Sequence, residues 1–408
     1  MAAGLLLVST TVGAIAAEPA EIRIVRAIDL ASLPLFVIEQ EKLIEKEAEA
    51  RGLPPVKLRW SAPGKTGPIE ALAAGQTDIA AVDIAPFLIA ADTSAGKPQD
   101  VRALAALAQR PYVLVARNPA IQTIRDFREA DRIAVPALKT SGPALMLEMA
   151  AAQEWGADHY DKLDPLAVAR PDPAAADALT ADKPDIAAHF SRSPYADDEL
   201  ASPGVHRVMD SFDISGAHSA VLLATTKRFR DANPVLCAAI VAAVTQADQL
   251  IRNNPGGAAE TYETIAKDQD LTLEDLTDMI GDPDLAYTAA PAGVMRLAEF
   301  MQRIGRLKRQ PQSWKDLFFP EAHDLPRRLK TLANQAGKPW LHATLAIGQA
   351  EERNVLGEPD RGQGLTASGM FIINPPHTLK AAMQAALPQL LEVLGRGRGQ
   401  GQTLDSGG

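Results

Sequence analysis

Residues Ala71–Phe87 read A-L-A-A-G-Q-T-D-I-A-A-V-D-I-A-P-F, and a similar stretch, A-L-T-A-D-K-P-D-I-A-A-H-F-S-R-S-P-Y, returns at Ala178–Tyr195. Each copy predicts the end of a helix, a polar turn, a short buried strand beginning at Asp78 or Asp185, and then a polar residue and a Pro-aromatic pair. Similarity at a fixed offset indicates repeated units, and two copies indicate two similar lobes rather than a solenoid. The alternative is that an alanine-rich α/β chain produces such an echo by chance.

The polar residues that follow the repeated strands are Asp83 in the first copy and His189 in the second. Ligands of open α/β sheets bind beyond the carboxyl ends of the strands, so we expect Asp83 and His189 to face each other across a cleft. Neither copy places a nucleophile beside a base. The repeat therefore predicts a binding cleft rather than a catalytic centre.

The composition limits the classes of function. A chain of 408 residues that is 47% apolar and 23% charged is typical of a globular protein with two or three domains. Its net charge is −10 and no basic block precedes residue 325, which argues against nucleic acid as a partner of the main body. The single cysteine, Cys237, excludes an intramolecular disulfide and a Cys-rich metal site.

The N-terminus has the pattern of an export signal. Residues 1–17 hold a short apolar core followed by small residues at Ala14 and Ala16, which suit signal-peptidase cleavage. The apolar run is too short to span a bilayer. We therefore expect a signal peptide and a periplasmic protein, the alternative being an apolar N-terminus that stays packed or disordered.

Polar loops after the first predicted strands are candidate ligand contacts. Asp29 and Ser32 follow a strand that ends near Ile28. Lys65, Thr66 and Gly67 open the helix leading to Ala71, and free backbone N–H groups at a helix start can bind an anion or a carbonyl oxygen. The full phosphate-loop pattern is absent around Lys65, so a nucleotide site is not predicted.

Two crossovers between the lobes are predicted. Val101–Val115 holds two strands separated by Gln109 and Arg110, which we interpret as the first crossover, and His218–Thr225 is interpreted as the return. Crossover residues touch both halves of a hinged protein. Arg110 is expected either to neutralise an anionic ligand group or to form an ion pair with an acidic neighbour.

The first helix of the second lobe begins in a polar turn. Thr140 or Ser141 is a plausible N-cap, with Pro143 in the first turn. The same hydroxyl and N–H groups could hold a ligand carboxylate or sulfonate. Capping alone and capping combined with ligand contact both stay open.

Several segments, in this order and spacing, carry a family resemblance: Pro34–Ala48 (P-L-F-V-I-E-Q-E-K-L-I-E-K-E-A), the A-L-A-A-G-Q-T-D-I-A unit, Ala134–Gly142, Thr225–Pro234 and the closing W-K-D-L-F-F-P. In these, residues 21 to 320 resemble the periplasmic solute-binding proteins of ABC importers in the aliphatic sulfonate, taurine and nitrate group. The resemblance implies a type II two-lobe α/β fold, with lobe 1 formed by residues 20–110 and 225–320 and lobe 2 by 111–224. It also implies a monomer without cofactor or metal that captures a small solute, closes, and docks on a membrane permease driven by an ATPase.

Matching positions one by one, the resemblance implies ligand contacts at Asp29, Ser32, Lys65, Thr66, Gly67, Asp83, Gln109, Arg110, Thr140, Ser141, His189 and His218. His189 is expected either to contact the ligand or to be a hydrogen-bonded wall residue, and a structural role is preferred for His218 and Lys65. Asp83 departs from what an anion site requires. It favours a ligand with an amine or several donors, such as a zwitterion, and argues against simple nitrate.

The chain changes character from about residue 325, where it becomes net basic. Trp340–Gln349 and Ser368–His377 are strand-like, and the second is similar to the S-G-M-F-I-I-N-P-P strand near the end of bacterial 23S rRNA adenine-N6 methyltransferases. The cofactor-binding half of such an enzyme is missing, so we expect an appended fragment without catalysis, joined either by a gene fusion or by a frame error between two reading frames. The glycine-rich end from Gly395 is expected to be disordered.

An enzyme remains an alternative for the main body. The thiamine pyrimidine synthase group resembles the same two lobes. Those enzymes use a Cys-rich iron motif, which a lone Cys237 does not provide.

Overall fold

The computed structural model describes residues 21–64, 67–267, 271–323, 333, 337–349, 367–394 and 398–407. The chain divides into two compact units, Met1–Ala322 and His323–Gly408. The predicted signal peptide, Lys65 and Thr66 lie outside the described residues.

The first sheet of the first unit, which we call lobe 1, has six strands in the order β11-β4-β10-β3-β1-β2. Its strands are β1 (Glu21–Val25), β2 (Lys57–Ser61), β3 (Ile79–Asp83), β4 (Val101–Gln109), β10 (Ser219–Thr226) and β11 (Ala286–Tyr287). β1 is parallel to β2 and β3, whereas β10 lies antiparallel between β3 and β4. The sheet is therefore mixed, with β10 as a central strand.

Helices cover both faces of this sheet. The alternation along β3 places Ile79 and Ala81 in one hydrophobic cluster, and Ala80 and Val82 in another. The first cluster includes α1 (Leu33–Glu41), α2 (Leu43–Ala50), α10 (Pro234–Asn253), α11 (Pro255–Ala266) and α12 (Leu273–Ile280). The second includes α3 (Gly67–Ala73), α4 (Ile84–Ser94) and α13 (Val294–Arg303). Burial on both faces explains why β3, β4 and β10 are mostly apolar, whereas the edge strand β2 alternates polar and apolar residues.

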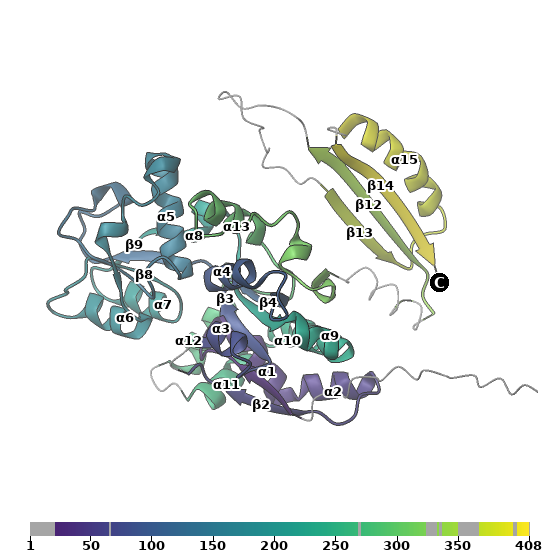
Figure 1. Cartoon of the computed structure of the whole chain (residues 1–408), viewed down its shortest axis with the longest axis horizontal. Coiled ribbons are helices and arrows are strands. Elements are labelled where there is room, and N and C mark those ends of the chain that lie inside the picture. Colours follow the sequence, from purple (N-terminus) through teal and green to yellow (C-terminus); the bar gives the residue numbers. More distant parts are fainter. Residues whose placement is uncertain are drawn as a thin grey trace, which may run out of the picture. The chain divides into compact units, whose positions relative to one another are not determined.

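The second sheet, which we call lobe 2, has five strands in the order β7-β6-β8-β5-β9. They are β5 (Val113–Ala116), β6 (Ile133–Val135), β7 (Ala167–Ala169), β8 (Ala188–Ser191) and β9 (His206–Asp210), with helices α5 (Gly142–Trp155), α6 (Asp172–Thr180) and α7 (Tyr195–Ala201). Figure 1 shows these elements gathered apart from α1, α10 and α11 of lobe 1. The two copies of the repeat thus supply β3 to one lobe and β8 to the other.

The crossovers differ in part from the prediction. The chain first leaves lobe 1 between β4 and β5, at Arg110–Tyr112, as expected. It returns through α8 (Ser211–Ser215), and β10 already begins at Ser219, so the interpretation of His218–Thr225 as the crossover is wrong, as is the placement of residues 219–224 in lobe 2. Polar residues at both ends of Ser219–Thr226 obscured the strand in the sequence. This segment is a central strand that pairs with β3 along one edge and with β4 along the other.

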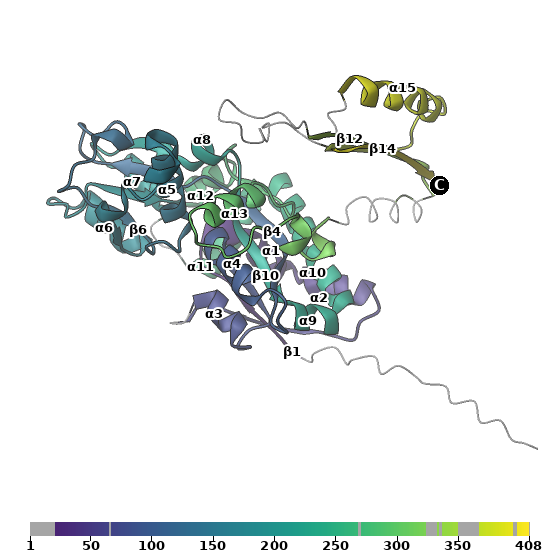
Figure 2. The same ribbon diagram turned by 45° about the horizontal axis from the view of Figure 1, so that its top comes forward.

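The remaining short elements of the first unit connect the main ones. They are α9 (Lys227–Ala232) and the 3₁₀ helices η1 (Leu30–Ser32), η2 (Ile124–Asp126), η3 (Ala157–His159), η4 (Asp164–Leu166), η5 (Trp314–Asp316) and η6 (Pro320–His323). Among the described residues one helix, α10, is long and apolar enough to cross a membrane. Its apolar stretch is 61% buried, and Figure 2 shows it beside lobe 1 elements, as a core helix would be.

The second unit is a three-stranded antiparallel sheet with one helix. β12 (Trp340–Gln349) pairs with β13 (Ala367–Ile373) and β14 (Arg398–Gly407), and α15 spans Leu379–Leu394. Strands occur where the sequence predicts them, but the expected disorder after Gly395 is wrong for Arg398–Gly407. Glycine backbone groups pair with β12 like those of any residue, and this ladder orders the segment.

Candidate functional site

A small cavity lies at the junction of the two lobes. Its volume is about 10 Å³, room for about one water molecule. Its lining comes from the loop after β1, the first crossover, the loop after β8 and the start of β10: Asp29, Ala31, Arg110, Pro111, Tyr112, Arg192, Ser193, Ala220 and Val221. Both lobes and a crossover contribute, so the cavity is what remains of an interlobe cleft in a closed arrangement.

Arg192 connects the lobes across this cleft. It follows β8 of lobe 2, and its Nη1 lies 3.3 Å from Asp83 Oδ1 and 3.8 Å from Asp29 Oδ2, both in lobe 1. Its Nε donates to Asp172 Oδ2 of lobe 2 at 2.8 Å. One guanidinium therefore faces three carboxylates, which we call the Arg192 cluster.

The pKa values of Asp83 and Arg192 each depend on the charged groups of the Arg192 cluster. Burial raises the pKa of Asp83, and Asp29 and Asp172 raise it further, whereas Arg192 lowers it. Burial disfavours the charge of Arg192, but the nearby carboxylates dominate and hold its pKa well above the usual value. Arg192 is thus charged in the closed cleft, and the ionisation of Asp83 depends on a cation beside it.

The lobe 1 carboxylates are placed by local structure. Asp29 is the N-cap of η1, where its Oδ1 accepts from the backbone N–H of Ser32 at 2.8 Å, which leaves Oδ2 towards Arg192. Asp83 ends β3 and precedes α4, but its side chain does not cap that helix. Ser32 is fully buried, and its hydroxyl has no hydrogen-bond partner among the described residues.

Arg110 lies in the first crossover and is buried. Its Nη1 donates to the carbonyl of Ser193 at 3.4 Å, and its Nη2 lies 3.7 Å from Asp197 of α7. Burial lowers its pKa, an effect that nearby acidic groups oppose. An acidic neighbour is therefore present, as one of the two interpretations expects, yet these contacts are long and the side chain still lines the cavity.

Tyr112 brings a buried donor to the same place. Its side chain is 1% exposed, and its hydroxyl has no hydrogen-bond partner in the described part of the chain. A Cβ added to Gly142, the first residue of α5, would lie 2.6 Å from Tyr112 Cζ, so the phenol packs directly on the start of that helix. Burial raises the tyrosine pKa well above its usual value, so the group is a neutral donor.

His189 is a wall residue behind the cavity. It is fully buried in β8, with Nδ1 2.7 Å from Glu199 and Nε2 3.4 Å from Asp172. Burial opposes its charge, but these two carboxylates raise its pKa. His189 therefore reaches Asp83 only indirectly, through Asp172 and Arg192, which supports the structural interpretation.

His218 and Ser211 tie the crossovers together. Ser211 exchanges hydrogen bonds with the backbone of Tyr112, and its Oγ lies 2.8 Å from His218 Nε2. This Ser–His pair resembles an activated nucleophile, but both residues are fully buried and burial lowers the His218 pKa to about 4. The pair does not line the cavity, and its place at the hinge indicates a structural role.

The other expected contacts lie away from the cavity. Ser141 is the N-cap of α5, accepts from Ala144 N at 3.3 Å and donates to Ala137 O at 2.7 Å. Thr140 is exposed, Gly67 begins α3 and Gln109 ends β4, and none of the three lines the cavity.

Sequence reasoning missed Arg192, Asp172 and Tyr112. Arg192 stands inside the repeated stretch, but the strand was expected to end at His189, whereas β8 continues to Ser191. The first residue beyond this true end is Arg192. A signal was available, because Arg192 directly precedes Ser193 and Pro194, where the strand cannot continue.

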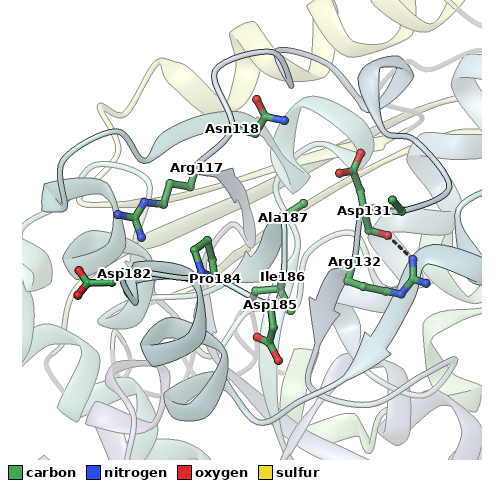
Figure 3. A pocket seen from close by; sticks show the side chains of 10 residues that line it. Arg117, Asn118, Asp131, Arg132, Asp182, Pro184, Asp185, Ile186 and Ala187 are labelled. Atoms are coloured by element: carbon green, nitrogen blue, oxygen red, sulfur yellow. Dashed lines mark hydrogen bonds between the residues drawn. The ribbon is translucent and has the colours of Figure 1, made fainter.

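A larger pocket, of about 460 Å³, opens at the opposite end of the lobe 2 strands. Figure 3 shows Arg117 and Asp182 on one side of it and Asp131 and Arg132 on the other. Arg117 donates to the carbonyl groups of Leu179 and Ala181, and Arg132 to those of Glu129 and Asp131. Arg117 is thus held by the end of α6 and Arg132 by its own loop, and a single lobe forms the pocket. The interlobe cleft is therefore the stronger candidate.

Among the described residues no group of three or more His, Cys, Asp or Glu side chains is placed to hold a metal ion. The sequence profile of the NMT1-like family matches residues 16–266, more than half of the chain. The chain belongs to the NMT1-like family. No curated protein matches this member of the family.

The fold of this NMT1-like chain is similar to the folds of several solved binding proteins. The alkanesulfonate-binding protein SsuA from Xanthomonas axonopodis pv. citri, bound to MOPS, matches with a TM-score of 0.57 and 18% identity, over 74% of this chain and 99% of that one. The periplasmic aliphatic sulphonate-binding protein SsuA from Escherichia coli matches with a TM-score of 0.57 and 17% identity, over 74% and 92%. The periplasmic nitrate-binding protein NrtA from Synechocystis PCC 6803 matches with a TM-score of 0.57 and 15% identity, over 78% and 89%. At these identities the likeness shows the fold, which is the α/β periplasmic binding protein fold expected from the sequence.

Proposed function

We propose that this protein is an extracytoplasmic solute-binding receptor of an ABC importer, which captures a small sulfonate-like or zwitterionic solute between its lobes. The observation that carries the proposal is the Arg192 cluster, because charged side chains from both lobes meet at one cavity beside a crossover. Its chemistry suits recognition of a charged solute. The SsuA and NrtA proteins, which share the fold, are named for binding sulfonates and nitrate.

The proposed closure of the two lobes depends on which lobe each solute contact belongs to. A solute shifts the population towards the closed form only if it binds that form better, which requires contacts with both lobes. Asp29 and Asp83 belong to lobe 1, whereas Arg192 and the start of α5 belong to lobe 2. A solute held between them gains its full set of contacts only when the lobes meet.

The partners follow from this role. A closed receptor would deliver its solute to a membrane permease driven by an ATPase, as a monomer and without a cofactor. Residues 1–17 would direct export to the periplasm. In this proposal the tail from residue 325 is an appended fragment resembling the end of an rRNA methyltransferase, with no part in capture.

A ligand screen by thermal shift tests the receptor role. We expect sulfonates or amino-sulfonates to raise the melting temperature of the full chain. An iron requirement for ligand binding, or stabilisation by S-adenosylmethionine, would contradict the proposal and favour the synthase or methyltransferase alternative.

A further inference from the structure

We propose that Arg192 stands in for a cationic group of the solute, so that the solute carries an ammonium, amidinium or guanidinium that pairs with Asp29 and Asp83. This inference rests on the proposed receptor function and assigns the class of solute. Arg192 then acts as a specificity-determining residue, because any solute must compete with it for the two carboxylates.

The charges around the cavity favour this assignment. Asp29, Asp83 and Asp172 surround a single guanidinium, and the other cation of the lining, Arg110, already has Asp197 beside it. Buried carboxylates that lack a cation are costly. The site therefore holds an excess of negative charge, which a cationic group would reduce and an anion would increase.

The contact lengths indicate which contacts of Arg192 break when the two lobes separate. Arg192 is anchored in lobe 2, next to β8, and its shortest contact is the 2.8 Å hydrogen bond to Asp172 of the same lobe. Its contacts to Asp83 and Asp29 in lobe 1 are longer, at 3.3 and 3.8 Å. On opening, Arg192 leaves with lobe 2. Asp29 and Asp83 then remain together on lobe 1, facing solvent without their cation.

A second observation points to a ligand at the same place. Tyr112 is 1% exposed and lines the cavity with Asp29 and Arg192, and its hydroxyl has no hydrogen-bond partner among the described residues. A buried donor of this kind destabilises the protein unless something accepts from it. The solute is thus expected to present a hydrogen-bond acceptor to Tyr112 and its cationic group to the two carboxylates.

The first experiment removes the guanidinium group of Arg192. In full-length Arg192→Ala, methylguanidinium chloride at millimolar concentration is expected to raise the melting temperature above that in sodium chloride of equal ionic strength. Arg192→Ala combined with Asp83→Asn is expected to lose this rise, whereas Arg192→Ala with Asp213→Asn, an exposed carboxylate on α8, keeps it. No rise in the single variant, or an equal rise with Asp83→Asn, overturns the inference.

The second experiment uses the unmodified protein, so that it does not depend on the folding of a variant. Native mass spectrometry would compare pairs of probes that differ only in an ammonium or a hydroxyl group, such as taurine with isethionate and β-alanine with 3-hydroxypropionate. Preference for the ammonium member by about tenfold or more, lost in Asp83→Asn, supports the inference. Binding of the hydroxyl members as well or better, unchanged in Asp83→Asn, overturns it and leaves the receptor function standing.

Discussion

Single residues in the cleft are positioned by strand ends and turns. Asp83 ends β3, Arg192 directly follows β8 and Asp29 caps η1, so each side chain is fixed by a change of backbone direction. Tyr112 is fixed instead by its contact with α5. Substitutions at these positions should separate the roles of charge, packing and hydrogen bonding.

Tyr112→Phe should leave the free energy of unfolding unchanged or raise it by about 1 kcal/mol, because a buried hydroxyl without a partner is removed. Solute binding should weaken. The matched control is Tyr287→Phe, whose equally buried hydroxyl donates to the carbonyl of Leu30 at 3.1 Å and whose loss should cost about 1 kcal/mol. Urea unfolding of both variants checks this, and an equal loss in the two would contradict it.

Arg192→Gln should lower the free energy of unfolding by an amount on the order of 3 kcal/mol, since Asp172 is left buried beside Asp83 and Asp29. Adding Asp172→Asn should recover part of the loss, which a double-mutant cycle measures by urea unfolding. Arg170→Gln breaks a pair with the exposed Asp185 and should cost less than about 1 kcal/mol. Equal losses in the two arginine variants would show that the Arg192 cluster is an ordinary surface pair.

Among the elements, α5 and α10 have the clearest tests. The start of α5 packs on the crossover residue Tyr112, and α10 forms much of the lobe 1 core. The contact of α5 with Tyr112 couples lobe 2 to the first crossover. The packing of α10 places the carboxylate of Asp248 in an apolar environment.

Gly142→Ala should destabilise the protein by about 2 kcal/mol, because the new Cβ would lie 2.6 Å from Tyr112 Cζ in a packed core. The control is Gly256→Ala in α11, where the added Cβ meets no atom nearer than 4.0 Å and the effect should be neutral or slightly stabilising. Thermal unfolding compares them. A Gly142→Ala variant as stable as Gly256→Ala would mean that α5 does not pack on Tyr112.

Asp248 of α10 gives a pH dependence. It is 2% exposed, and burial raises its pKa to about 7, although the Ala289 N–H and Arg252 favour its charge. Between the usual carboxyl pKa and pH 7 the folded protein therefore binds a proton that the unfolded chain releases, so stability falls as pH rises through this window. Asp248→Asn should remove that decline and be more stable than the wild type at pH 8 by an amount on the order of 4 kcal/mol.

Urea unfolding between pH 4 and 8 checks the Asp248 prediction. Asp278→Asn, an exposed carboxylate on α12, should keep the wild-type dependence. Parallel slopes for the wild type and Asp248→Asn would contradict the assignment.

The sequence predicts the elements better than it predicts the contacts between them. Apolar runs bounded by polar turns were sufficient to find β3 and β8, and Asp83 followed because it ends its strand. Arg192 was missed because β8 runs two residues beyond His189, and its pairing with Asp29 is more than 160 residues distant in the chain. No local pattern encodes such a pair; it arises only when two lobes close on each other.

For the whole molecule, the lobes meet at more than the cleft. One hydrophobic cluster includes residues of β4 and β10 as well as β5, β6 and α5. Arg306, just after α13, also pairs with Glu148 of α5 and donates to the carbonyl of Lys139. Separation of the lobes would break these contacts together with the Arg192 cluster. A solute that favours closure would therefore add its contacts to an interface that the two lobes already form.

The most direct test of solute capture is native mass spectrometry of the full chain after incubation with a small-molecule cell extract. We expect one bound small molecule per protein, retained by the wild type and by Asp213→Asn and lost from the double variant Asp29→Asn with Asp83→Asn. A protein that retains no small molecule would contradict solute capture, and an adduct retained equally without the two carboxylates would contradict their role in it.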